Sequence, residues 1–181
     1  MIQITLEDSI TSSRNNADDR HALLESDRLA YLSFRVGEHG YAVDLLQIRE
    51  VRSLPQLTRV AHAPSYVLGV ISLRGEIVPV IDLKKRFSLA QSQSSATPLV
   101  VVSEVEGRKV AMLVDSVNEV VSVSAQEIQS IPRTTMAIDM KYLLGMVQHE
   151  SQVLLLLDLR KILTPSELHN VSEAIEERIP A

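Results

Sequence analysis

The chain has 181 residues, of which 45% are apolar, and its 18 basic and 23 acidic residues give a formal charge of −5. A net negative charge provides no attraction to phosphate backbones, and the lack of Trp, with only 3% aromatic residues, removes stacking platforms for single-stranded nucleic acid. We therefore expect no nucleic-acid partner, and either one ordinary domain or two small subdomains with a common core.

The first 28 residues are polar, charged and aperiodic, which predicts a disordered arm because too little apolar surface is available to offset the entropy of ordering it. They contain no basic region followed by an apolar core and so do not resemble a signal peptide. A second polar segment, residues 91–97, predicts an exposed loop. The folded domain is expected at residues 29–164, with subdomains at about 29–90 and about 97–164, and an exchange of elements between them is left open.

Strand-like periods dominate the folded part. Leu32, Phe34 and Val36 alternate with polar residues, which predicts a short half-buried strand. The apolar runs at residues 77–81 and 153–157 predict strands that are covered on both faces, and the Pro in the first run places that strand at an edge or a bulge. Four or five short strands in each half are too many to remain flat, so we predict an all-β fold of two small closed barrels.

The two halves of the folded part resemble each other in sequence. Residues 66–87 align with residues 142–163 at an offset of 76, so that Tyr-Val-Leu-Gly matches Tyr-Leu-Leu-Gly. Upstream, residues 48–51 align with residues 117–120 at an offset of 69. Two matches in the same order predict a duplicated module.

Helical segments are expected to be few. Asp82 and Asp158 each follow an apolar strand, and we interpret both as structural caps, since the same Asp recurs with no His or Ser beside it. Thr164 and Glu167 form a capping box that begins a C-terminal helix over residues 165–181. The apolar stripe of this helix is expected to pack on a barrel, with partner binding as the alternative. It consists of Leu168, Val171, Ile175 and Ile179.

Patterns of catalysis are missing from the sequence. The His residues have no metal-ligand spacing, the glycines form no phosphate-binding loop, and no Ser lies in a nucleophile elbow. Zero Cys excludes disulfides, thiolate nucleophiles and Cys-ligated metals, and no apolar run approaches the roughly 20 residues of a membrane-spanning helix. We expect a cytoplasmic, non-enzymatic binding protein with no cofactor, no metal and no direct membrane insertion.

A charged turn, Arg74-Gly75-Glu76, joins the two apolar runs of the first module. Gly75 can supply the positive φ that a tight hairpin requires, which leaves Arg74 and Glu76 projecting from its end. Glu50, on another strand of the module, is a suitable ionic partner for Arg74. An exposed pair contributes only about 0 to 1 kcal/mol, so either a partner contact or a merely solvated face remains open.

Three segments carry a family resemblance: YLSFRVGEHGYAVDLLQIREVR, RVAHAPSYVLGVISLRGEIVPVIDLKKRF and AMLVDSVNEVVSV. They resemble the CheW family of coupling proteins in bacterial chemosensory arrays, over about residues 29–163. The resemblance implies two SH3-like five-stranded β-barrels around a shared hydrophobic core. It also implies no catalytic activity and an adaptor that bridges the cytoplasmic tip of a chemoreceptor to the regulatory domain of a CheA-type histidine kinase.

The resemblance further implies candidate receptor-binding or kinase-binding residues. Glu50 and Arg74 are similar to a family pair that links the receptor and kinase surfaces, while the apolar candidates have a structural alternative as core residues. Gly69 has its own alternative, which is close packing of the strand backbone. Receptor contact in the family uses the groove between the barrels, and kinase contact uses barrel ends. The six candidates are Ile48, Glu50, Gly69, Arg74, Leu99 and Val120.

Two other functions are left open by the sequence. A groove between the barrels could hold a small molecule, which would make the chain a ligand-binding sensor. Members of the resembling family also serve twitching motility and surface sensing, so the pathway need not be flagellar chemotaxis.

Overall fold

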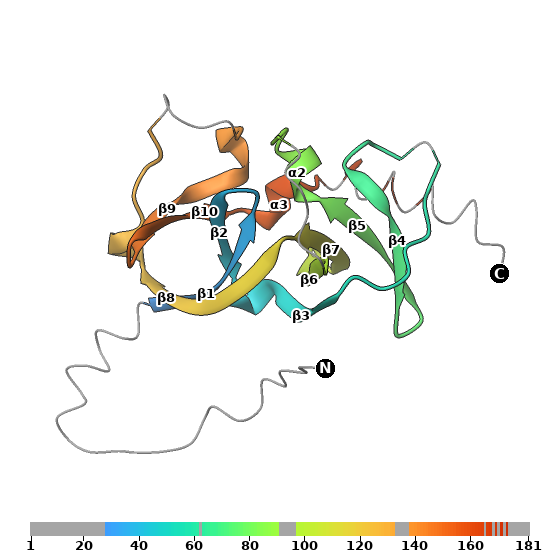
Figure 1. Cartoon of the computed structure of the whole chain (residues 1–181), viewed down its shortest axis with the longest axis horizontal. Coiled ribbons are helices and arrows are strands. Elements are labelled where there is room, and N and C mark those ends of the chain that lie inside the picture. Colours follow the sequence, from blue (N-terminus) through green and yellow to red (C-terminus); the bar gives the residue numbers. More distant parts are fainter. Residues whose placement is uncertain are drawn as a thin grey trace, which may run out of the picture.

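The computed structural model describes residues 28–61, 63–90, 97–132 and 138–164, together with helical residues at positions 166, 167, 169, 171 and 173. In this part of the chain, ten strands form two five-stranded sheets, and each sheet curls into a small barrel (Figure 1). The prediction of an all-β fold with two SH3-like barrels is confirmed. The predicted arm lies outside the described residues except for Arg28, which begins the first strand.

The first barrel combines strands from both ends of the folded chain. Its strand order is β8-β1-β2-β10-β9, in which β2 and β10 are parallel and the other neighbours are antiparallel. Its strands are β1 (Arg28–Val36), β2 (His39–Asp44), β8 (Ser116–Ser124), β9 (Leu143–His149) and β10 (Gln152–Leu157).

The second barrel is built from the middle of the chain. Its strand order is β3-β6-β7-β5-β4, with β5 and β7 as the parallel pair. Its strands are β3 (Ile48–Ser53), β4 (Val67–Leu73), β5 (Glu76–Asp82), β6 (Leu99–Val105) and β7 (Arg108–Val114).

The two barrels have equivalent topologies, because β1 to β5 correspond in order to β6 to β10. Strands β4 and β9 begin 76 residues apart, as do β5 and β10, which agrees with the offset of the sequence match. Each barrel contains the first two strands of one module and the last three strands of the other. The boundary at residues 91–97 therefore separates the modules in sequence but not the barrels in space, and this arrangement is an exchange of elements between modules.

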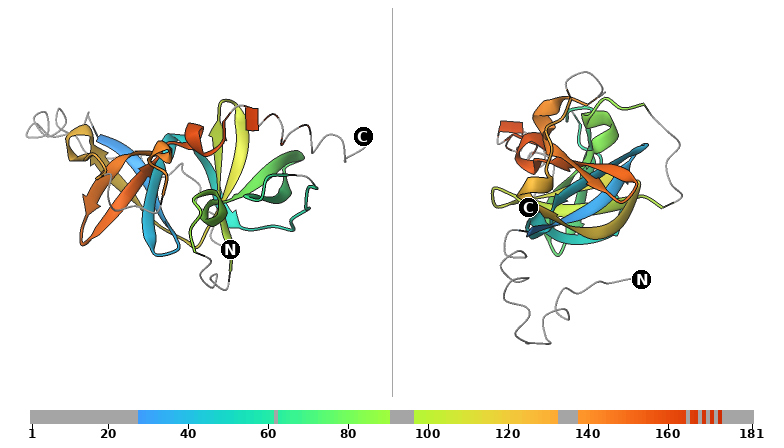
Figure 2. Two further views of the ribbon diagram at one scale, coloured as in Figure 1. Left: turned by 90° about the horizontal axis from the view of Figure 1, so that it is seen from above. Right: turned by 90° about the vertical axis from the view of Figure 1, so that its left-hand side faces the viewer.

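The chain passes between the barrels at two points. The first crossover runs from Asp44 to Ile48 through the short helix η1 (Leu45–Gln47), and the second is the single residue Asp115 between β7 and β8. In Figure 2 the barrels lie side by side in one view and one behind the other in the second view.

Pro79 lies in β5, which is a central strand with β4 on one side and β7 on the other. The prediction of an edge or a bulge at this residue is therefore wrong. The ladder between β5 and β7 covers only Val80, Ile81 and Asp82, so Pro79 stands one residue before it. The missing N–H of Pro79 thus does not interrupt the pairs with β7.

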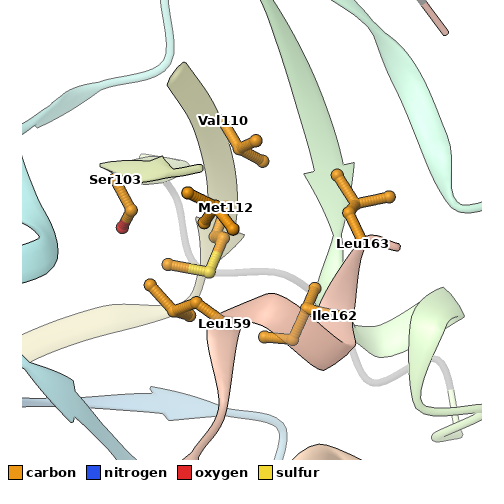
Figure 3. A pocket seen from close by; sticks show the side chains of 7 residues that line it. Ser103, Val110, Met112, Leu159, Ile162 and Leu163 are labelled. Atoms are coloured by element: carbon orange, nitrogen blue, oxygen red, sulfur yellow. The ribbon is translucent and has the colours of Figure 1, made fainter. Parts of the chain in front are cut away.

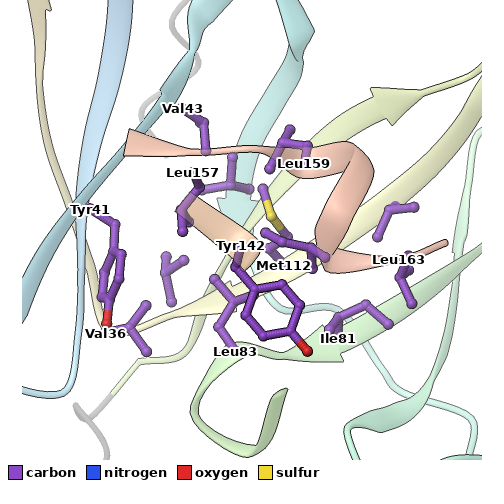
Figure 4. Packing of buried hydrophobic residues seen from close by; sticks show 14 of the residues in the cluster. Val36, Tyr41, Val43, Ile81, Leu83, Met112, Tyr142, Leu157, Leu159 and Leu163 are labelled. Carbon is purple, nitrogen blue, oxygen red and sulfur yellow. The ribbon is translucent and has the colours of Figure 1, made fainter. Parts of the chain in front are cut away.

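A shared core joins the barrels. Each barrel has a small interior cluster of its own, but the largest cluster includes side chains from both sheets and from the short helices α2 (Leu83–Arg86) and α3 (Leu159–Ile162), as Figure 4 shows. Four aromatic rings cross this core in sequence, with centroid separations of 6.1, 5.6 and 5.4 Å. Such ring pairs add about 0.5 to 1.5 kcal/mol beyond the burial of their area. The four rings belong to Phe34, Tyr41, Phe87 and Tyr142.

An Asp side chain caps the short helix that follows each of the two apolar strands β5 and β10. Asp82 Oδ1 accepts a hydrogen bond from Lys85 N at 3.1 Å, and Asp158 Oδ1 accepts one from Arg160 N at 3.1 Å. The capping box is present as well, since Thr164 N donates to Glu167 Oε2 at 2.9 Å and Glu167 N donates to Thr164 Oγ1 at 3.3 Å. In the helical stripe, Val171 is buried in the shared core, while Leu168, Ile175 and Ile179 lie outside the described residues.

Candidate partner-binding surface

The hairpin between β4 and β5 ends in a two-residue turn. Leu73 pairs with Glu76, and the two residues between them have positive φ, 52° for Arg74 and 85° for Gly75. Positive φ at both central positions defines a type I′ turn, whose twist matches that of the flanking strands. The turn leaves the side chain of Arg74 86% exposed at the rim of the second barrel.

Glu50 and Arg74 meet across this rim. Glu50 Oε2 lies 3.6 Å from Arg74 Nη2, and Glu50 Oε1 lies 3.6 Å from Arg52 Nη1. Glu50 belongs to β3 and Arg74 follows β4, the two outer strands of the sheet, so the contact depends on the curling of the sheet into a barrel. Solvent screens such a pair, and its contribution to stability is about 0 to 1 kcal/mol. We call Glu50, Arg52 and Arg74 the charged rim.

The first barrel has a corresponding hydrogen-bonded pair. Glu119 aligns with Glu50 in the duplicated module, and His149 occupies the position equivalent to Leu73, one residue before that of Arg74. Glu119 Oε1 lies 3.2 Å from His149 Nε2. Sequence reasoning aligned the two glutamates but did not identify the second pair, because His and Arg do not occupy the same aligned position.

The apolar candidates have different environments. Ile48 is buried in the shared core, and Leu99 is half-buried against it, so both have the packing expected of structural residues. Val120, on β8 of the first barrel, is 52% exposed. The structure thus brings Glu50 and Arg74 together but leaves Val120 on the other barrel.

Leu46 is an exposed apolar residue that the sequence analysis did not select. It lies in η1 on the first crossover and is 79% exposed. Leu29 of β1 is also half exposed. The Leu-Leu pair at residues 45–46 indicates that one leucine of a short polar connection could be exposed. Only the crossover geometry shows that Leu46 is the one that faces solvent.

Gly69 permits a close backbone contact. A Cβ at this position would lie 2.2 Å from Thr58 O, and the backbone groups of Thr58 and Val70 exchange hydrogen bonds of 2.9 and 2.8 Å. Gly145 is equivalent in the first barrel, where a Cβ would lie 2.6 Å from Ile128 Cγ2 and 3.0 Å from Gln129 O. Both glycines allow the segment after the preceding strand to lie against the outer strand of its barrel.

Two hollows among the described residues are small. One is a cavity of about 10 Å³ between the second barrel and α3, into which the side chains in Figure 3 project. The other has about 210 Å³ and opens at the β1–β2 turn of the first barrel. Typical small-molecule pockets have about 300 to 1,000 Å³. The residues lining the first are Ser103, Val105, Val110, Met112, Leu159, Ile162 and Leu163.

Two other features are absent from the described ranges. No cluster of three or more His, Asp or Glu side chains there could hold a metal ion. No helix in the same part of the chain has the length and apolar character needed to cross a membrane.

Comparison with known proteins decides the family. The sequence model of the CheW-like domain matches residues 30–167. The chain belongs to the CheW family. The chemotaxis protein CheW of Klebsiella aerogenes is 33% identical over 138 residues, which cover 76% of this chain and 83% of that protein. The chemotaxis protein CheW of Rhizobium meliloti is 32% identical over 136 residues, which cover 75% and 87%.

A solved CheW structure has the same fold. The scaffolding protein TtCheW of Thermoanaerobacter tengcongensis superposes with a TM-score of 0.70 at 27% identity, covering 77% of this chain and 94% of that protein. The match confirms the resemblance that the three sequence motifs indicated. The described rim, crossover and exposed apolar residues therefore belong to a CheW-type chemotaxis scaffold.

Proposed function

We propose that this chain is a non-enzymatic, cytoplasmic adaptor that couples chemoreceptors to a CheA-type histidine kinase. The observation that carries the proposal is the Glu50–Arg74 pair, held at the end of a barrel in a chain of the CheW family. The pair contributes little to stability, and Arg74 is almost wholly exposed. Charges in this position suit the recognition of a partner surface.

The two kinds of exposed residue suit two kinds of partner. The charged rim can dock on the barrel end of the kinase regulatory domain. Opposite charges orient the two similar folds relative to each other, and like charges disfavour binding to the wrong partners. Val120 and Leu46 offer apolar area, which suits the helical tip of a receptor. Ile48 lies in β3, the strand of Glu50, and Leu99 pairs with Ser53 at the end of that strand, so we expect both to act by supporting the strand that carries the contact residue.

Adaptor function requires contacts that are specific but exchangeable. Interfaces at or below about 1,600 Å² of total buried area, with few apolar anchors and a charged rim, give modest affinity. Simultaneous engagement in an array raises the effective strength of each contact through a high local concentration. No single pair of proteins has to bind tightly.

Binding measurements can test both contacts separately. Full-length protein is titrated against the kinase regulatory domain and against a receptor-tip fragment, with Arg74→Ala and Val120→Ser as variants. We expect Arg74→Ala to weaken kinase binding about tenfold, which corresponds to about 1.4 kcal/mol, and Val120→Ser to weaken receptor binding.

Lys141→Ala is the control, because it removes an exposed ion pair with Asp139 at 2.8 Å, at the short helix η3 (Met140–Tyr142), that includes none of the candidate contact residues. It should leave both affinities unchanged. If the wild-type protein binds neither fragment, the adaptor proposal fails. If the wild-type protein binds both fragments and Arg74→Ala and Val120→Ser bind as tightly as wild type, the proposal holds but the assignment of the two surfaces is wrong.

A further inference from the structure

Arg86, at the end of α2, lies where the two modules meet. Its guanidinium carbon is 4.2 Å from the ring centroid of Tyr66 and 5.3 Å from that of Tyr142. Its Nε donates a hydrogen bond of 2.7 Å to the carbonyl of Ile162. At the module offset of 76, Tyr66 corresponds to Tyr142 and Arg86 corresponds to Ile162. One side chain of the first module therefore contacts both equivalent tyrosines and its own counterpart in the second.

Glu167 supplies the charge opposite Arg86. Glu167 Oε2 lies 2.9 Å from Arg86 Nη2, and Glu167 Oε1 accepts a hydrogen bond of 2.8 Å from the Tyr66 hydroxyl. Oε2 also accepts from Thr164 N as part of the capping box. The side chains of Arg86 and Glu167 are only 11% and 27% exposed, so water screens this pair weakly.

The titration of these groups agrees with a tightly held cluster. Burial, with the hydrogen bond to Glu167, raises the pKa of Tyr66 to about 12. Burial alone would raise the pKa of Glu167, but hydrogen bonds from Thr164 and Tyr66 and the charge of Arg86 together lower it. The carboxylate is therefore the form that the cluster holds at neutral pH.

The C-terminal helix that contains Glu167 also has a buried apolar contact and an exposed face. Val171 is buried in the shared core, whereas His169 and Glu173 form an exposed pair at 3.2 Å. The helix is thus held from one side by Glu167 and Val171. The described residues between 164 and 173 are called the C-terminal clamp below.

We propose that the C-terminal clamp and the junction between the barrels form one cooperative unit, joined through Arg86, so that release of the clamp loosens both modules at the junction. Without Glu167, the largely buried guanidinium lacks its carboxylate, which favours movement of Arg86 toward water. That movement removes the contacts of Arg86 with both tyrosines and with the Ile162 carbonyl. The inference rests on contacts within the chain and is independent of the adaptor proposal.

Two equivalent hydrogen bonds report on the junction. Asp82 N donates to Tyr66 O at 2.8 Å in the first module, and Asp158 N donates to Tyr142 O at 2.9 Å in the second. Amide hydrogen exchange at these two positions, followed by NMR in the full-length protein, measures the opening of each side separately.

Glu167→Ala is the decisive variant. We expect exchange to become at least tenfold faster at Asp82 and Asp158 as well as in the clamp. Arg86→Met should produce the same pattern, including faster exchange in the clamp, although its substitution lies outside it. Glu173→Ala is the matched control, because it breaks the exposed pair of the same helix and should leave both junction amides unchanged.

Faster exchange confined to the clamp in Glu167→Ala would overturn the proposal, since the helix would then be an independent appendage. Faster exchange at Asp82 with no change at Asp158 would also overturn it, because the two modules would not be coupled. If Glu167→Ala does not fold, Glu167→Gln keeps the volume and removes the charge, and the same two outcomes apply to it.

Discussion

The two barrels have the same strand order, and the positions at which they agree or differ show what the fold itself requires. Gly69 and Gly145 occur at equivalent positions, and each allows the same close approach of a backbone segment. The rim pairs differ, with Arg74 beside Glu50 in the second barrel and His149 beside Glu119 in the first. A barrel of this kind thus forms without an arginine at this rim position, which supports the proposed role of Arg74 in partner binding.

The two crossovers differ more strongly. Asp44 caps η1 by accepting a hydrogen bond of 2.9 Å from Leu46 N, and the crossover leaves Leu46 exposed. Asp115 instead binds groups of both barrels, with Lys84 Nζ at 2.7 Å and Gly37 N at 2.6 Å. The second crossover is therefore an internal tie between the barrels, whereas the first presents an apolar side chain to solvent.

The largest effect on stability is expected from adding a side chain at the two glycines of the outer strands, where another backbone segment lies close. Gly69→Ala places a Cβ against a backbone oxygen at a φ of 150°, and we expect a loss of about 3 kcal/mol in the free energy of unfolding. Gly145→Ala should lose only about 1 to 2 kcal/mol, because the Ile128 side chain can move and the backbone contact, with Gln129 O at 3.0 Å, is longer than that at Gly69. Urea denaturation measures both.

Gly37→Ala is the control for these glycines, since its φ is 63° but no atom lies within 4 Å of the added Cβ. It should lose about 1 kcal/mol from backbone strain alone. Equal losses for Gly69→Ala and Gly37→Ala would show that the contact with Thr58 has no energetic weight.

The crossovers should differ in their tolerance of substitution. Asp115→Ala leaves Lys84, which is only 11% exposed, without its carboxylate, and we expect a loss of about 2 kcal/mol in unfolding free energy. Asp44→Ala removes one cap and should lose about 1 kcal/mol. Denaturant titration of both variants under one condition gives the comparison. An Asp44→Ala loss as large as that of Asp115→Ala would contradict the distinction between the crossovers.

A smaller, pH-dependent effect is expected at Asp158. Hydrogen bonds from the Arg160 side chain lower the pKa of this carboxyl in the folded state. A lowered pKa stabilises the fold above the unfolded value of about 3.9, and this stabilisation is lost as the pH falls through the folded pKa. Asp158→Asn keeps an acceptor for Arg160 N, so it should lose about 0.5 kcal/mol at pH 7.

Melting temperatures at pH 7 and pH 3 test this effect. The difference between wild type and Asp158→Asn should shrink at the lower pH. Arg160→Gln should reproduce the behaviour, because it removes the other member of the pair. A difference that grows on acidification would reverse the sign of the linkage and contradict the assignment.

Much of the fold could be predicted from local sequence patterns. Alternation at Leu32, Phe34 and Val36 identified a strand, and the offset of 76 identified the duplication, because both signals lie within short segments. The exchange of strands between modules left no such signal, since periodicity specifies which face of a strand is buried but not which strand pairs with it. The misplaced edge at Pro79 has the same cause, because pairing with β7 begins one residue later.

The candidate surface was predictable only in part. The Arg74–Gly75 turn and the pairing of Arg74 with Glu50 could be proposed from turn chemistry and opposite charge. The burial of Ile48 and the exposure of Leu46 depend on the crossover, and the cluster around Arg86 depends on contacts between residues up to 101 positions apart. Such long-range contacts are fixed by tertiary packing.

Receptor control of kinase activity tests the central claim most directly. Receptor-containing membranes and a CheA-type kinase are combined with and without the full-length chain, and kinase autophosphorylation is measured before and after addition of a receptor ligand. We predict ligand-dependent activity only when the chain is present, and a severalfold smaller response with Arg74→Ala than with the Lys141→Ala control. Kinase activity that responds to the ligand equally with and without the chain would contradict its role as the coupling protein.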